Sequence, residues 1–187
     1  MSSSLKNMFI QVVDTQLSLR SMLDDIANFP TKPPSLFFGL EGNNVGRCGS
    51  INIISLFAVP RKTAYLVDVH LLGSDAFTIT NNKNNSIKTV LESPSIPKVF
   101  FDVRNSSDAL FNLYNISLSG VEDLQLMELA YRPGPNSSKK YLADLATCVE
   151  QSSLLLDAQK REWERGSKKK ARMFDYQQIL DAPMRVH

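Results

Sequence analysis

The sequence predicts an α/β fold in which helices flank a mixed β-sheet. Three apolar, β-branched segments follow one another between residues 35 and 69, and their short links favour an antiparallel meander. Strand and helix patterns then alternate, and the remainder of the chain has mainly helical patterns. At 187 residues the chain can build a sizeable core, so we expect one domain over residues 1–187.

The first half of the chain begins with an apolar run at 8–13 that predicts a strand. Asp14 or Thr15 can cap a following helix that stops at Pro30. The helix has an apolar face at i, i+3, i+4 and i+7, formed by Leu19, Met22, Leu23 and Ile26. The three strands of the meander are expected at 35–40, 50–59 and 63–69, separated by the glycine-rich turn EGNNVGRCG and by Pro60 to Lys62.

The second half alternates strands and helices. Short helices are expected at 86–92 and 123–131, strands at 98–103 and from Val121, and a helix from near Ser106. That last helix should bury Leu110, Leu113 and Tyr114, and the 123–131 helix should carry Leu126, Leu129 and Ala130 on one face. After the breaker RPGPN we predict a helix at 139–151 and another at 154–165; the first should bury Leu142, Leu145, Ala146 and Val149.

Composition indicates a soluble globular protein. Hydrophobic residues make up 43% of the chain and charged residues 21%, and no apolar run is long enough for a membrane helix. Cys48 and Cys148 form neither a disulfide framework nor a zinc motif, so we expect an intracellular location, cytoplasmic or nuclear, and no membrane partner.

Basic residues concentrate near the C-terminus. The last 28 residues carry eight Lys or Arg and four Asp or Glu, with the densest run at Lys168, Lys169 and Lys170. This run is either the solvated end of a helix or a patch that contacts phosphates.

Three segments resemble the 3′–5′ exonuclease domain family, the ribonuclease D-like branch of the DEDD nucleases. LFFGLEGNNVGRCGSINIISL is similar to the first motif of that family, and IPKVFFDVRNSSDALFNLYNI to the second. VEDLQLMELAYRPG is similar to the stretch that follows, and the resemblance extends from about Phe9 to the C-terminus. It implies a ribonuclease H-like sheet, in which an antiparallel three-strand meander is joined by parallel strands.

The resemblance also implies metal-dependent hydrolysis of nucleic acids. In this family two divalent ions, Mg²⁺ or Mn²⁺, clamp the phosphodiester, and four carboxylates hold the ions because hard cations take oxygen ligands. The first-motif Asp is shared by both ions, and a Tyr or His of the third motif orients the attacking water.

The first motif keeps one of its two acids. The family's Asp falls on Gly39, whereas its Glu is present as Glu41, the candidate catalytic and metal-binding residue. Side chains alternate along a strand, so positions 39 and 41 should face the same side. Arg47, in the turn, is either a surface residue or a contact to a nucleic-acid backbone.

The second motif lacks its acid as well. Counting back four residues from Leu110 places the family's Asp on Ser106. A shifted alignment would place it on Asp108 instead. Residues 106 and 108, however, point about 200° apart on a helix and are not interchangeable. Asp102 lies four residues earlier, and the neighbouring Asn105 is a candidate nucleic-acid contact.

The third motif is expected to fall beyond this chain. The tail FDYQQILDAPMRVH resembles the lead-in to that motif, so the domain is expected to be incomplete at its C-terminus. We therefore expect an exonuclease-like domain that holds no metal and binds nucleic acid, RNA ahead of DNA, or acts as a scaffold. The alternatives are an active 3′–5′ exonuclease, in which Asp102 or Asp108 substitutes, and a protein-interaction module or homodimer.

Overall fold

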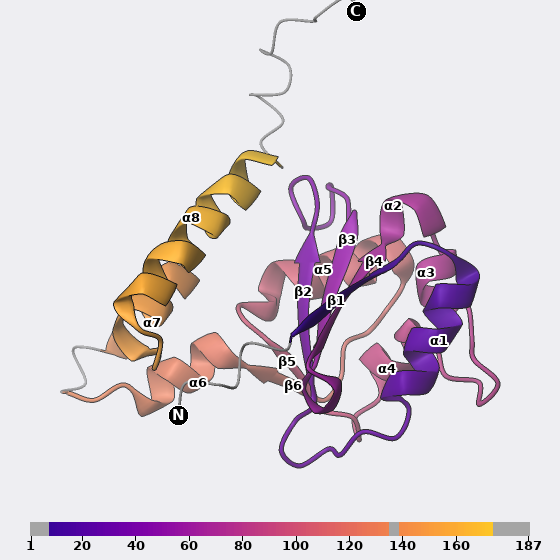
Figure 1. Ribbon diagram of the computed structural model, residues 1–187, viewed down its shortest axis with the longest axis horizontal. Coiled ribbons are helices and arrows are strands. Elements are labelled where there is room, and N and C mark those ends of the chain that lie inside the picture. Colours follow the sequence, from indigo (N-terminus) through magenta and orange to yellow (C-terminus); the bar gives the residue numbers. More distant parts are fainter. Residues whose placement is uncertain (1–7, 135–138, 174–187) are drawn as a thin grey trace, which may run out of the picture. The chain divides into compact units, whose positions relative to one another are not determined.

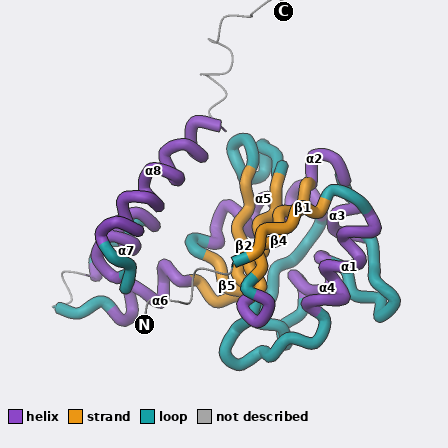
Figure 2. The backbone as a smooth tube through the Cα atoms, in the orientation of Figure 1, coloured by secondary structure: helices purple, strands orange, loops and turns teal. Residues whose placement is uncertain are grey.

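A computed structural model describes residues 8–134 and 139–173. The chain divides into two compact units, residues 1–124 and 125–187. Figure 1 gives the order of the elements, and Figure 2 separates helices from strands by colour. The first unit contains a six-stranded sheet in the order β1-β4-β3-β2-β5-β6. The strands are β1 Phe9–Val13, β2 Leu36–Glu41, β3 Ile53–Ala58, β4 Thr63–Asp68, β5 Lys98–Phe100 and β6 Val121–Asp123.

The sheet is mixed, as the sequence predicts. Strands β2, β3 and β4 form the antiparallel meander, with Gly39 opposite Ser55 and Ser55 opposite Leu66. Strand β5 pairs in parallel with β2, and β6 pairs in parallel with β5. Strand β1 adds a parallel edge strand next to β4, and its Phe9, Ile10 and Val12 are largely exposed.

Helices of the first unit cover one face of this sheet. They are α1 Gln16–Ile26, α2 Val69–Leu72, α3 Asp75–Thr78, α4 Ile87–Glu92 and α5 Val103–Tyr114, together with the 3-10 turn Val59–Arg61. The connections β1–α1–β2, β4–α4–β5 and β5–α5–β6 join parallel strands in one direction along the sheet. Right-handed crossovers therefore place α1, α4 and α5 on the same face.

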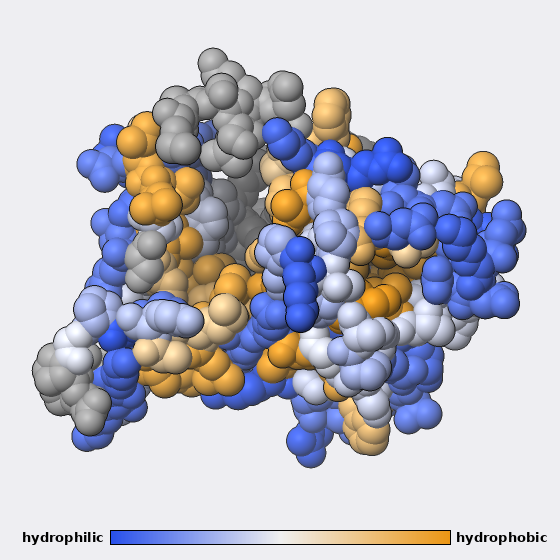
Figure 3. All heavy atoms as spheres, turned by 90° about the horizontal axis from the view of Figure 1, so that it is seen from below, coloured by the Kyte–Doolittle hydropathy of each residue, from blue (hydrophilic) through white to orange (hydrophobic). Residues whose placement is uncertain are grey.

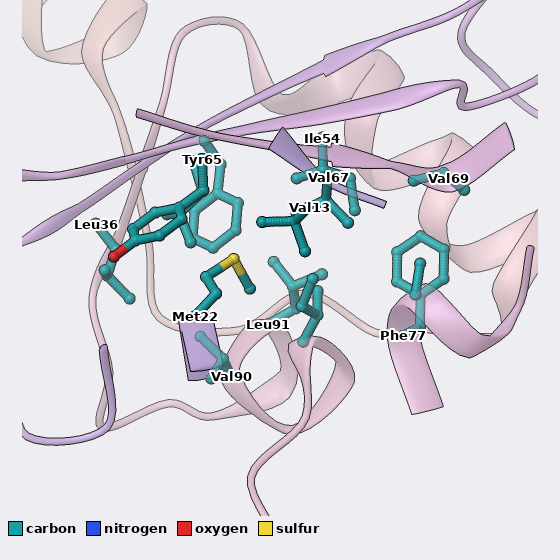
Figure 4. Packing of buried hydrophobic residues seen from close by; sticks show 14 of the residues in the cluster. Val13, Met22, Leu36, Ile54, Tyr65, Val67, Val69, Phe77, Val90 and Leu91 are labelled. Carbon is teal, nitrogen blue, oxygen red and sulfur yellow. The ribbon is translucent and has the colours of Figure 1, made fainter. Parts of the chain in front are cut away.

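The hydrophobic core lies between those helices and the sheet. Figure 4 shows Met22 of α1 and Leu91 of α4 pointing toward Ile54 and Val67 of the strands, all buried. Helix α1 buries the four residues of its predicted apolar face, and Thr15 caps it. Helix α5 joins this layer through Tyr114, whose ring centroid lies 4.2 Å from that of Phe77.

The opposite face of the sheet carries the alternate residues of each strand. Phe37, Gly39 and Glu41 of β2 are half-buried there, as are Ser55 and Phe57 of β3. The mixed character of this face contrasts with the apolar, buried helix-covered face.

Helix α5 begins earlier than predicted. It starts at Val103, three residues before Ser106, because the Asp123 carboxylate accepts hydrogen bonds from the backbone N–H groups of Asp102 and Val103, both at 3.1 Å. The strand expected at 98–103 is correspondingly shorter. Leu110 is buried, but the prediction that Leu113 is buried was wrong, since its exposed fraction is 36%.

The second unit contains α6 Leu124–Tyr131, α7 Leu145–Ser152 and α8 Asp157–Met173. Helix α6 begins at Leu124, the last residue of the first unit. The predicted helix at 139–151 was wrong in its first six residues: the Asp144 side chain accepts from Thr147 N at 2.7 Å and caps the helix there. Leu142, Leu145 and Ala146 are exposed rather than buried, and Leu126 is exposed on α6. Figure 3 shows apolar side chains reaching the surface among polar ones.

Candidate functional site

The first-motif positions lie at the carboxyl end of β2, between β3 and β5. A Cβ atom added to Gly39 would lie 3.8 Å from Glu41 Oε1 and 3.9 Å from Ser55 Cβ. Positions 39 and 41 therefore share one face, as strand alternation predicts. A ligand bound by Glu41 would find no side chain to contact at position 39, because that residue is glycine.

Packing does not require the glycine at position 39. The added Cβ would make ordinary van der Waals contacts, and the backbone there has no positive φ. Gly42 and Gly49 differ, because a Cβ on either would overlap a backbone carbonyl oxygen, that of Ser50 or of Asn44. The turn needs its own glycines, whereas position 39 has room for the Cβ of a larger residue.

Arg47 ties the β2–β3 turn to helix α5. Its backbone N–H donates to Asp108 Oδ2 at 2.8 Å, its Nε to the same oxygen at 3.3 Å, and its terminal nitrogen to Oδ1 at 3.1 Å. Asn112 Nδ2 adds a bond to Oδ1 at 3.1 Å. We call this arrangement of Arg47 and Asp108 the turn clamp. It gives Asp108 a structural partner on each carboxylate oxygen.

The remaining second-motif residues lie near the start of α5. Ser106 is half-buried and Asn105 is exposed. Asp102 occupies the N-cap position with a φ of 55° but makes no capping side-chain hydrogen bond, and its carboxylate instead accepts two hydrogen bonds from Arg104, at 2.7 and 2.8 Å. Those bonds hold the pKa of Asp102 below its usual range. Asp102 is thus ion-paired with Arg104 at the start of the helix.

Two residues near this site were missed by the sequence analysis. Asp123, at the end of β6, positions the start of α5. Arg104 lies in the first turn of α5, and its side chain has an exposed fraction of 68%. The available signal was an acid directly after a short strand, since the carboxyl ends of neighbouring parallel strands meet at one edge of a sheet.

The residues at this site do not fit the pair of divalent ions that the resemblance implies. Among the described residues, no three His, Cys, Asp or Glu side chains come close enough together to hold a metal ion. Glu41 is the acid at the first motif, and glycine and serine offer no carboxylate at positions 39 and 106. Mg²⁺ favours carboxylates in near-octahedral geometry, which this donor set does not supply.

The basic run near the C-terminus is described in part. Lys168 lies on α8 and pairs with Glu164 at 2.7 Å. The side chains of Lys169 and Lys170, and the whole of the tail at 174–187, lie outside the described residues. Within the part of the chain that is described, no helix is long and apolar enough to cross a bilayer.

The fold and the position of the site define a class of protein. A meander of three antiparallel strands is extended by the parallel strands β5 and β6 on one side and by the parallel strand β1 on the other. This is the layout of the ribonuclease H-like 3′–5′ exonuclease domains, and the resemblance predicted from the sequence is confirmed at the level of the fold.

Particular relatives agree with this class. Over 91 residues the chain is 31% identical to the piRNA biogenesis protein EXD1 of Danio rerio, a match to 49% of this chain and 22% of that protein. Ribonuclease D of Trypanosoma brucei in complex with GMP shares 22% identity at a TM-score of 0.65, over 82% of this chain and 44% of that one. The same enzyme in complex with RNA U12 shares 20% identity at a TM-score of 0.58, over 91% and 62%.

No protein-family model matches the chain. The chain spans about a fifth of the length of the curated relative and less than two thirds of either ribonuclease D chain. At these identities the solved structures show that the fold is shared.

Proposed function

We propose that this chain is a 3′–5′ exonuclease-like domain that binds nucleic acid, RNA ahead of DNA, without cleaving it. The observation that carries the proposal is an exonuclease fold whose site has Gly39 and Ser106 where the family places aspartates. We further propose that the two compact units are parts of one such domain, and that its compartment is intracellular.

Loss of the carboxylates favours binding over hydrolysis. Without two ions to activate water and stabilise the leaving oxygen, the rate enhancement of this chemistry is lost. Fewer carboxylates also repel a phosphate backbone less, and Arg47 and Arg104 place exposed guanidinium groups on the turn and on α5. The bound RNA in the ribonuclease D structure supports nucleic acid as the partner of this fold.

Asn105, Arg47 and Lys168 to Lys170 are the proposed nucleic-acid contacts outside the metal positions. Asn105 and the Arg47 side chain are exposed on α5 and on the turn. The pairing of Lys168 with Glu164 is solvent-exposed and therefore weak, so phosphate can compete for that ammonium group.

The test combines binding and cleavage on the same protein. Fluorescence anisotropy with a labelled single-stranded RNA should show binding that weakens as salt increases. The same RNA, incubated with the protein and Mn²⁺, should stay intact, and Glu41→Gln should leave binding unchanged or tighter. Stepwise release of nucleotides that disappears in Glu41→Gln would show an active exonuclease and overturn the proposal, as would salt-independent or absent binding.

A rebuilt site tests the proposed loss of metal binding. Gly39→Asp with Ser106→Asp should bind Mn²⁺ about tenfold or more tightly than the parent chain, because position 39 has room beside Glu41. Gly166→Asp is the matched control, since it adds an acid where no atom lies within 4 Å. Isothermal titration measures both. Equal, weak Mn²⁺ binding by all three proteins would show that the scaffold, and not the two side chains, excludes the ions.

A further inference from the structure

Two exposed tyrosines lie ten residues apart in the second unit. Tyr131 ends helix α6 and has an exposed fraction of 85%, and Tyr141, three residues before the Asp144 cap of α7, has one of 71%. An aromatic ring exposed to water lacks most of the stabilisation that its burial would supply. Two such rings in one unit therefore indicate a binding surface.

The segments that carry these rings are held together by hydrogen bonds. Arg132 donates to the backbone oxygen of Tyr141 at 3.0 Å, and Lys139 donates to that of Ala130 at 2.7 Å. Arg132 is fixed in turn by Glu128, whose Oε1 accepts from its Nε at 2.8 Å. Because these bonds cross between the end of α6 and the following segment from both directions, the two rings are mounted on a fixed backbone.

Cationic side chains lie on the same two segments as the rings. The ammonium of Lys140 lies 5.2 Å from the centroid of the Tyr141 ring, within the range of a cation–π contact. Lys139 adds a further positive charge, whereas the charge of Arg132 is balanced by Glu128. The Glu128 carboxylate is already paired with Arg132, which lowers its pKa and keeps it ionised. The surface therefore combines flat aromatic faces with positive charge.

This combination suits a single-stranded nucleic acid. Unpaired bases stack on aromatic side chains whatever their sequence, while lysines and arginines contact the phosphates between them. In a duplex the bases already stack on one another, and their faces are not available to the tyrosines. An acidic peptide would use the charges but would leave the rings without a flat partner.

We infer that Tyr131 and Tyr141 form a stacking site for single-stranded nucleic acid, with Lys139 and Lys140 contacting its phosphates. The inference rests on the proposed function, since it specifies how and in which strand state this chain holds nucleic acid. It adds contact residues in the second unit to the exonuclease motif positions on β2 and α5 of the first.

The test measures anisotropy of a labelled oligouridine on the full chain, single-stranded and annealed to its complement. Tyr131→Ala with Tyr141→Ala should weaken single-strand binding about tenfold or more, because the loss of one stacked base alone weakens binding by about that factor. Tyr131→Phe with Tyr141→Phe should bind within about threefold of the parent chain, because the ring faces remain. Circular dichroism checks that each variant is folded.

Controls separate stacking from general apolar loss and from the proposed function. Leu154→Ala with Leu156→Ala removes exposed apolar side chains from the same unit and should leave binding unchanged. Crosslinking with a 4-thiouridine oligonucleotide should label the segments around Tyr131 and Tyr141. Undiminished binding by the alanine pair, with crosslinks only at residues 36–50 or 102–108, would overturn this inference and leave the proposed function standing. No binding by the parent chain would overturn both.

Discussion

Among the described residues, Lys98 is the charged residue that is buried. It is fully buried on β5, and its ammonium donates to the backbone oxygens of Val90, at 2.9 Å, and of Ser93. Both oxygens lie at the C-terminal end of α4, where the helix dipole favours a cation. Burial nevertheless lowers the pKa of Lys98 to about 8. Lys98 links β5 to α4, and its ammonium group loses its proton at a lower pH than that of an exposed lysine.

This pKa predicts a distinct dependence of stability on pH. Below pH 8 both folded and unfolded chains carry the proton, and the folded state bears the full cost of a buried charge. Between about 8 and 10.5 the folded chain has released it while the unfolded chain retains it, so the free energy of unfolding rises with pH. The rise should be on the order of 1–3 kcal/mol relative to Lys98→Met, measured by urea denaturation from pH 7 to 10.

The comparison with Lys98→Met is needed because Tyr65 acts in the opposite direction. Burial, aided by its hydrogen bond to Asp25, raises the pKa of Tyr65 to about 12. The folded chain therefore keeps a proton that the unfolded chain loses above pH 10, and stability falls there. Both proteins share this fall, which cancels in the difference. Parallel pH profiles for the two proteins would contradict the role given to Lys98.

At the scale of elements, the turn clamp joins the first-motif hairpin to the second-motif helix. The charge pair alone is worth little because the Arg47 side chain has an exposed fraction of 70%. Its backbone N–H bond to Asp108 is the more directional contact, since it fixes the turn itself. Asp108 therefore determines where the hairpin ends relative to α5.

Asp108→Asn should loosen the turn without unfolding the sheet. The amide keeps one acceptor oxygen but loses the charge and the second acceptor, so we expect a stability loss of about 1 kcal/mol. Cys48 follows Arg47 directly and is exposed, which makes its thiol a reporter of turn motion. In a Cys148→Ser background, the rate at which a thiol reagent modifies Cys48 should increase about threefold or more.

Arg47→Lys supplies the control for that experiment. Lysine keeps the positive charge and the backbone N–H but loses the forked contact, so its rate should lie between those of the parent and Asp108→Asn. A Cys48 rate that does not change in Asp108→Asn would show that the turn is held by its own hydrogen bonds, such as that from Ser50 N to Asn43 O at 2.9 Å.

Elements with strong local patterns were predictable from the sequence. The apolar face of α1, the three strands of the meander and the short helix α4 each depend on residues close to one another in the chain. Errors arose where a distant residue decided the boundary. Asp123 moves the start of α5, and the side chains of Arg132 and Lys139 hold the segment that the sequence predicts as helix.

The site divides in the same way. Alternation along β2 was enough to place positions 39 and 41 on one face, because it is a property of any strand. The partner of Asp108 was not predictable, since Arg47 lies 61 residues away in the chain. The tyrosine surface was missed for a related reason: exposure of Tyr131 and Tyr141 follows from tertiary packing, and both occur in segments whose patterns suggested ordinary helices.

At the scale of the whole molecule, the apolar core is confined to the first unit. Every hydrophobic residue that is buried among the described ones lies between Val13 and Ile116. On helix α6 the buried residue is instead the polar Gln125, which donates to Ala143 O at 2.8 Å. The first unit therefore contains most of the apolar burial that drives folding.

Native-state hydrogen exchange should resolve this difference. Amides of α7 and α8 should exchange through openings that need at least about 2 kcal/mol less than those of β3 and β4. The expectation follows from the absence of buried apolar side chains on the described parts of those helices. Equal protection in α7 and β3 would show that the second unit is stabilised by burial outside the described residues.

The parallel strand β1 also bears on how this protein can be handled at the bench. It covers the outer edge of β4, and its Phe9 amide donates to Lys62 O at 3.0 Å. A shortened expression clone that began at Asp14 would uncover a six-residue edge with Tyr65 and Val67 in it, and bare edges of that kind recruit strands from other chains. Such clones should precipitate, and cloning boundaries are best placed ahead of Phe9.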